Sequence, residues 1–82
     1  LEHLTKELAV RFAKKGVRIN CIAYGGVEGR STLSFKKKYS NFAPIGRMLK
    51  EDEIPGPVDF IISNKTSGMT GHILKVDGGW SL

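Results

Sequence analysis

The sequence has few of the residues from which small proteins build internal cross-links. Its one cysteine, Cys21, cannot form an intramolecular disulfide, and together with His3 and His72 it falls short of the four ligands of a structural zinc site. We therefore expect no metal site. A single thiol within an apolar segment is typical of a reducing compartment, and without a cross-link a chain of 82 residues has only a marginal core of its own.

Long apolar runs are also missing. No uninterrupted stretch approaches the roughly 18 residues that a membrane-spanning helix needs, and no basic segment followed by an apolar one resembles a secretion signal. We therefore expect a cytoplasmic protein that does not bind a membrane. The 13 basic and 8 acidic residues give a net charge of +5, which is only modest support for a nucleic-acid binder.

Apolar residues near the start of the chain recur at helical spacing. Leu1, Leu4, Leu8 and Phe12 share one stripe opposite charged residues, which predicts an amphipathic helix that ends at Gly16. The pattern is already under way at the first residue, with no capping Ser, Thr, Asp or Asn before it. We therefore expect the chain to be part of a longer one.

Two further segments predict strands of one sheet. Residues 17–23 alternate and then become continuously apolar, which is typical of a strand buried on both faces of a parallel sheet, and residues 73–76 form a short β-branched run. Between them we expect a short helix over residues 33–39, a loop over residues 41–46, and a longer helix whose regular part begins near residues 55–57. This order predicts an α/β fold with two parallel, adjacent strands in a right-handed connection.

A sheet of only two strands conflicts with the buried pattern of the first. Residues 17–23 are suited to partners on both sides, yet the sequence supplies one partner, residues 73–76. We therefore predict that residues 1–82 form a single incomplete domain. Asn20, at the start of the apolar run, is expected to fix the local geometry by hydrogen bonding.

Four pieces of the sequence, in this order and spacing, resemble the C-terminal third of a short-chain dehydrogenase/reductase. They are residues 18–27 (RINCIAYGGV), 44–47 (PIGR), 60–71 (FIISNKTSGMTG) and 76–80 (VDGGW). The resemblance implies a Rossmann-like doubly wound parallel sheet, of which this chain supplies the last helix, strand, helices and strand. It also implies that NAD or NADP binds at the carboxyl ends of the strands.

The residues that carry out the family's hydride-transfer chemistry are absent. That chemistry uses a Tyr-x-x-x-Lys pair, in which the phenol exchanges a proton with the substrate oxygen and the lysine assists it. Here Glu28 follows Tyr24 by four positions and Ala43 follows Tyr39, and the family's glycine-rich pyrophosphate loop is missing too. We therefore predict no catalytic residue in this chain, and no activity of the 82 residues alone.

The loop after the first strand resembles the family's nicotinamide-side loop, Pro-Gly-x-Val-x-Thr. Gly25 and Val27 match this pattern, whereas Tyr24 stands in place of the proline and Gly29 in place of the threonine. The resemblance implies that Tyr24 and Val27, with the glycines between them, contact the cofactor in the intact enzyme. The set of expected cofactor-binding residues is thus Tyr24, Gly25, Gly26 and Val27.

The resemblance further implies an alcohol/ketone oxidoreductase with a small-molecule substrate. Residues 28–39 correspond to the family's mobile substrate lid, and the first helix to one that often pairs with its symmetry mate. Val10, with Ala9 and Ala13 nearby, suits such a contact, so we expect a homo-oligomer, either a dimer or a tetramer.

Two other hypotheses stay open on the sequence alone. The first is a non-catalytic interaction or oligomerisation module, which the unpaired sheet edge favours. The second is a basic nucleic-acid-binding fragment, since the three lysines of residues 36–38 lie beside Tyr39 and Phe42. A solvated helix face explains the same lysines, and we expect no nucleic-acid partner.

Overall fold

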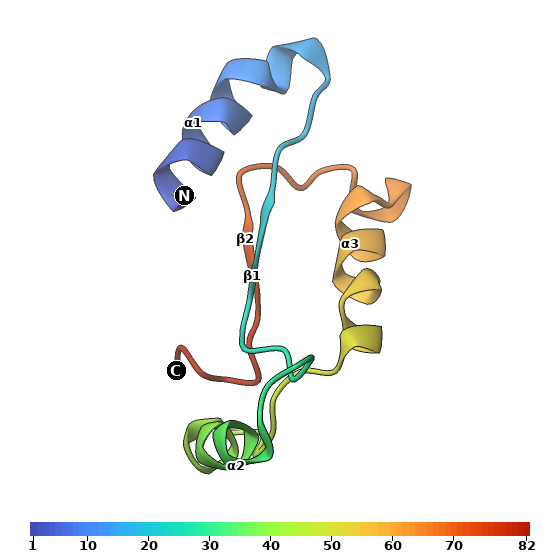
Figure 1. Cartoon of the computed structure of the whole chain (residues 1–82). Coiled ribbons are helices and arrows are strands. Elements are labelled where there is room, and N and C mark those ends of the chain that lie inside the picture. Colours follow the sequence, from blue (N-terminus) through green and yellow to red (C-terminus); the bar gives the residue numbers. More distant parts are fainter.

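Two parallel strands lie between helices in the order helix, strand, helices, strand. The computed structural model describes all of residues 1–82, and its elements are α1 (Glu2–Phe12), β1 (Cys21–Tyr24), α2 (Leu33–Phe42), α3 (Pro55–Ile62) and β2 (Ile73–Val76), with short 3-10 turns over residues 13–15, 51–53 and 64–66. In Figure 1, α1 and α3 lie on opposite sides of the strand pair, and α2 lies beyond the carboxyl ends of the strands.

The strands pair as the sequence predicts. β1 and β2 are parallel and adjacent, in a register that runs from Cys21 opposite Ile73 to Tyr24 opposite Val76. β1 is shorter than the predicted strand, because the residues just before it form hydrogen bonds to side chains in place of strand backbone. The Ile19 amide, for example, donates to the Thr70 hydroxyl at 3.0 Å. The α/β fold with a helical crossover between parallel strands is confirmed.

α1 ends as predicted, and only part of its apolar stripe is covered. Gly16 adopts the left-handed conformation with a φ of 76°, which closes the helix through a short 3-10 turn. The buried positions are Thr5 and Ala9, whereas Leu1 and Leu4 of the apolar stripe are 84% and 51% exposed. Leu8 and Phe12 of the same stripe are half-buried, so the stripe is only partly covered within these 82 residues.

The other two helices begin at the residues that favour helix starts. α2 starts after Thr32, whose hydroxyl accepts a hydrogen bond from the Phe35 amide at 3.1 Å, and it continues three residues beyond the predicted end. α3 starts at Pro55, where a missing amide proton costs nothing, as expected. No helix combines the length and hydropathy that crossing a bilayer requires.

The buried core is small and lies mostly near the carboxyl end of β1. The five buried residues are Thr5, Ala9, Ala43, Met48 and Leu49. The radius of gyration is 15.2 Å, against roughly 12 Å for a compact domain of this length. Apolar side chains on both sides of the strand pair are therefore only partly covered.

The turn after β2 packs closely on the segment that follows α2. Gly78 and Gly79 have φ angles of 63° and 86°, and a Cβ at these positions would lie 2.7 Å from Ile45 and 2.9 Å from Pro44. The Ile45 amide also donates to the Gly78 carbonyl at 3.1 Å. The end of the chain therefore supports the base of α2.

Candidate functional site

The four residues that follow the pattern of a cofactor loop lie together at the carboxyl end of β1. The Gly25 amide donates to the Val76 carbonyl at 2.9 Å, which extends the strand pairing by one residue. The Tyr24 hydroxyl donates to the Ile54 carbonyl at 2.5 Å, at the start of α3. The loop is thus anchored to both β2 and the crossover.

Both glycines of this loop are required by the space around them. A Cβ on Gly25 would lie 2.8 Å from the Cα of Asp77, and a Cβ on Gly26 would lie 2.7 Å from the ring of Tyr39. Neither glycine has a positive φ. Close approach of neighbouring groups, rather than backbone conformation, therefore excludes larger residues.

Val27 carries an unpaired backbone donor and acceptor. It forms a parallel bridge with Leu49, in which the Leu49 amide donates to the Gly26 carbonyl and the Glu28 amide donates to the Leu49 carbonyl, both at 2.8 Å. A parallel bridge uses the groups that flank Val27, so its own N–H and C=O point away from Leu49. They make no hydrogen bond within this chain, and together they match a ligand that carries both a donor and an acceptor, such as a primary amide.

Tyr39 of α2 reaches the same loop, a contact that sequence reasoning missed. Its hydroxyl accepts a hydrogen bond from the Gly26 amide at 2.7 Å. Its ring stacks on Trp80 with centroids 4.4 Å apart and 17° between the planes, and Phe35 lies at 6.3 Å. The only feature of the sequence that could have indicated this contact is the pair of aromatic residues at helical spacing, residues 35 and 39.

This position of Tyr39 bears on the nucleic-acid hypothesis. The lysines of residues 36–38 lie on α2, with Lys37 and Lys38 exposed. Stacking on bases requires free aromatic faces next to such charges. One face of Tyr39 is occupied by Trp80, whereas Phe42 is 76% exposed, so one of the two aromatic residues named in that hypothesis is engaged within the chain.

An ion pair holds the segment that carries Leu49. The Arg47 guanidinium donates to both carboxylate oxygens of Glu53, at 2.6 and 3.1 Å, and to the Met48 carbonyl. The Glu53 carboxylate also accepts from the Lys50 amide at 2.8 Å. The hydrogen bond from Arg47, followed by that from the Lys50 amide, lowers the pKa of Glu53 to about 2.

The depressed pKa of Glu53 predicts a defined pH dependence. A lowered pKa in the folded state means that the contribution of Glu53 to stability is present above its ordinary pKa of 4.5 and is lost as the pH falls toward 2. NMR titration of the Glu53 carboxyl carbon in the folded protein should give a midpoint near 2. Arg47→Gln should return that midpoint toward the ordinary value, and a wild-type midpoint near 4.5 would contradict the prediction.

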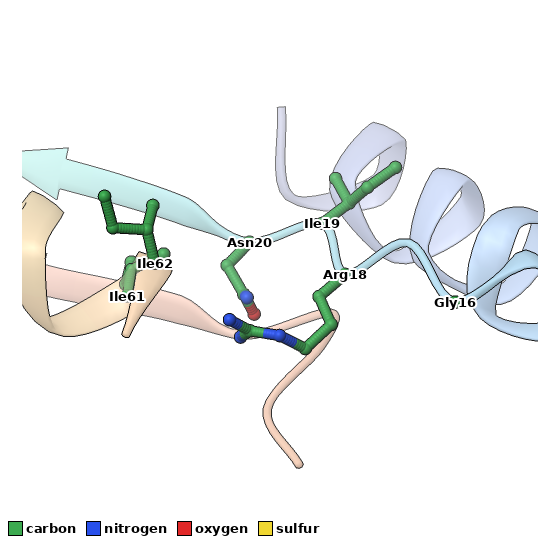
Figure 2. A pocket seen from close by; sticks show the side chains of 6 residues that line it. All are labelled: Gly16, Arg18, Ile19, Asn20, Ile61 and Ile62. Carbon is green, nitrogen blue, oxygen red and sulfur yellow. The ribbon is translucent and has the colours of Figure 1, made fainter. Parts of the chain in front are cut away.

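A separate polar cluster lies at the opposite, amino-terminal end of the strands. Arg18 donates to the carbonyls of Thr66 and Met69, both at 3.0 Å. Asn20 donates to Met69 at 3.0 Å and accepts from the His72 amide at 2.9 Å, as expected from its sequence position. Both side chains line a hollow of about 430 Å³, and Figure 2 shows how they lie. Periodicity did not reveal the role of Arg18, because its partners are main-chain carbonyls.

The chain is similar over nearly its whole length to known oxidoreductases. A family model described as enoyl-(acyl carrier protein) reductase matches residues 1–81. The uncharacterized oxidoreductase YmfI of Bacillus subtilis is 38% identical over 79 residues, covering 92% of this chain and 33% of the relative. Galactitol 2-dehydrogenase (L-tagatose-forming) of Cereibacter sphaeroides is 34% identical over 88 residues, covering 100% of this chain and 35% of the relative.

The fold of the chain is also similar to that of solved structures. A short-chain dehydrogenase from Leptospira borgpetersenii with bound NAD+ superposes with a TM-score of 0.92 at 36% identity, covering 99% of this chain and 32% of the other. The chain thus spans about a third of the length of the relatives it matches. Its two strands and their helices are the C-terminal part of a Rossmann-like doubly wound sheet, and the chain belongs to the short-chain dehydrogenase/reductase family.

Proposed function

We propose that this chain is the C-terminal part of a cytoplasmic NAD(P)-dependent oxidoreductase that interconverts a small-molecule alcohol and a ketone. Residues 1–82 form a single incomplete domain of that enzyme. They contribute the nicotinamide-side loop, the substrate lid and part of an oligomer interface, whereas the proton-transfer residues and the pyrophosphate loop belong to the rest of the fold. Family membership supports the reaction class.

The observation that carries the cofactor assignment is the unpaired backbone of Val27 at the carboxyl end of β1. A nicotinamide carboxamide carries one acceptor and one N–H donor group, which complement the free N–H and C=O of Val27. The bound NAD or NADP supplies the hydride acceptor or donor. Tyr24 anchors this loop to the start of α3, and Gly25 and Gly26 let it pack closely against Asp77 and the ring of Tyr39.

The proposed substrate lid covers residues 28–39, which include the first part of α2. It lies beyond the carboxyl ends of the strands, where Rossmann-like folds bind their ligands (Figure 1). A relative named for oxidation of galactitol supports an alcohol as substrate.

The face of α1 that carries Val10 and Ala13 is proposed to pair with a second copy, giving a homodimer or homotetramer. Val10 is 80% exposed and Ala13 is also exposed, so small and apolar side chains are available there for close helix contact.

The test of the proposed function uses the full-length protein. Calorimetric titration with NAD+ and with NADP+ should give saturable heat for one of them, and adding a panel of secondary alcohols should produce the reduced nucleotide. Absence of binding to both nucleotides would refute the proposal.

The isolated 82-residue chain should bind neither NADH nor NADPH. It lacks the pyrophosphate-binding loop, which provides most of the anchoring of a dinucleotide, so the Val27 contacts alone give little affinity. The same calorimetric titration, run with the isolated chain beside the full-length protein, checks this. Micromolar binding by the isolated chain would contradict it.

A further inference from the structure

The peptide that presents Val27 is held on both sides of Gly26. The Gly26 carbonyl accepts from the Leu49 amide at 2.8 Å, and the Gly26 amide donates to the Tyr39 hydroxyl at 2.7 Å. The Gly26 carbonyl and the Val27 N–H belong to one planar peptide unit. Fixing both backbone groups of a glycine, which otherwise has wide conformational freedom, therefore fixes the direction of the Val27 N–H.

The tyrosine that makes this contact is itself held in place. Its ring lies against Gly26 so closely that a Cβ there would be 2.7 Å from Cε2 of the ring. The Trp80 ring also stacks on the Tyr39 ring, with their centroids 4.4 Å apart, and holds it in place. Trp80 is set by the turn after β2, in which the Asp77 carboxylate accepts from the amides of Gly79 at 3.0 Å and Ser81 at 3.3 Å.

We propose that Tyr39 is a positioning residue for the cofactor: its hydroxyl fixes the Gly26 backbone so that the N–H of Val27 stays directed at the carboxamide. The inference rests on the proposed function and deepens it. It also joins the lid to the cofactor loop, because Tyr39 belongs to α2. The role acts on cofactor affinity and leaves the affinity for the alcohol unchanged.

The experiment compares Tyr39→Phe with Ser40→Ala in the full-length protein. Tyr39→Phe removes the acceptor and keeps the ring and its stack. Ser40→Ala removes the neighbouring hydroxyl, which bonds only to the Lys36 carbonyl within the helix at 2.7 Å. We expect Tyr39→Phe to weaken binding of the preferred nucleotide about tenfold, with the KM for the alcohol unchanged, whereas Ser40→Ala should change neither.

A second readout needs no cofactor. Amide hydrogen exchange of the free protein should become about tenfold faster at Gly26 in Tyr39→Phe and stay unchanged in Ser40→Ala. The thermal midpoint of each variant shows whether the fold is intact.

The outcomes separate this inference from the proposed function. If the wild type binds nucleotide and Tyr39→Phe binds it equally well, the positioning role is overturned and the proposed function stands. Unchanged exchange at Gly26 would overturn it as well. If the wild type binds neither nucleotide, the proposed function fails, and the positioning role fails with it.

Discussion

Replacing Gly25 with valine in the full-length protein should lower turnover by at least roughly a hundredfold. The new Cβ would lie 2.8 Å from the Cα of Asp77 and 3.2 Å from its carbonyl oxygen, and backbone atoms cannot move aside as a flexible side chain can. The loop must therefore shift away from the end of β2, which carries Val27 away from the nicotinamide. Steady-state kcat and the KM for the nucleotide measure the effect.

The matched control is Gly68→Val. Gly68 also has a φ that is not positive, and nothing in the chain lies within 4 Å of a Cβ built there. It should keep turnover close to that of the wild type. Unchanged turnover and nucleotide affinity in Gly25→Val would mean that the loop is only a turn, and that the cofactor assignment is wrong.

Amide protons of residues 17–23 should exchange without slow, cooperative protection in a dilute monomer of the isolated 82-residue chain. β1 pairs with β2 alone, so its other edge has no strand partner. No large side chain is fully buried, and exposed residues such as Val58 and Ile62 leave the α3 side open as well. The apolar area buried by this chain alone is too small to offset the conformational entropy lost when the backbone is ordered.

The control is amide exchange of the same residues in the full-length protein. There, residues 17–23 should exchange slowly and together, because a larger sheet covers both edges. Sedimentation of the isolated chain should reveal aggregates or strand-exchanged oligomers. Slow protection in a sedimentation-verified monomer would show that the segment folds independently.

Elements governed by local rules were predictable from the sequence. The bounds of β2, residues 73–76, follow from a short β-branched run before two glycines, and α3 begins at Pro55 because proline lacks the amide proton that a helix start does not need. The left-handed close of α1 at Gly16 follows from the freedom of glycine.

Contacts between distant segments were not predictable in the same way. The bond from Gly26 to Tyr39 depends on the path of the crossover, and no periodicity encodes it. The same holds for Arg18, whose guanidinium donates hydrogen bonds to main-chain carbonyls more than 40 positions away in the sequence. How far the leucine stripe of α1 is covered also depends on distant segments: Leu1 and Leu4 are exposed, whereas Leu8 and Phe12 are half-buried.

The stack of Trp80 on Tyr39 gives the lid a built-in optical reporter. Trp80 is the only tryptophan among these 82 residues, and its indole stacks on the ring of Tyr39 in α2. A motion that carries α2 away from the turn after β2 separates the two rings and changes the surroundings of the indole. Tryptophan fluorescence can therefore follow opening and closing of the lid without an attached dye, provided that tryptophans elsewhere in the enzyme are replaced.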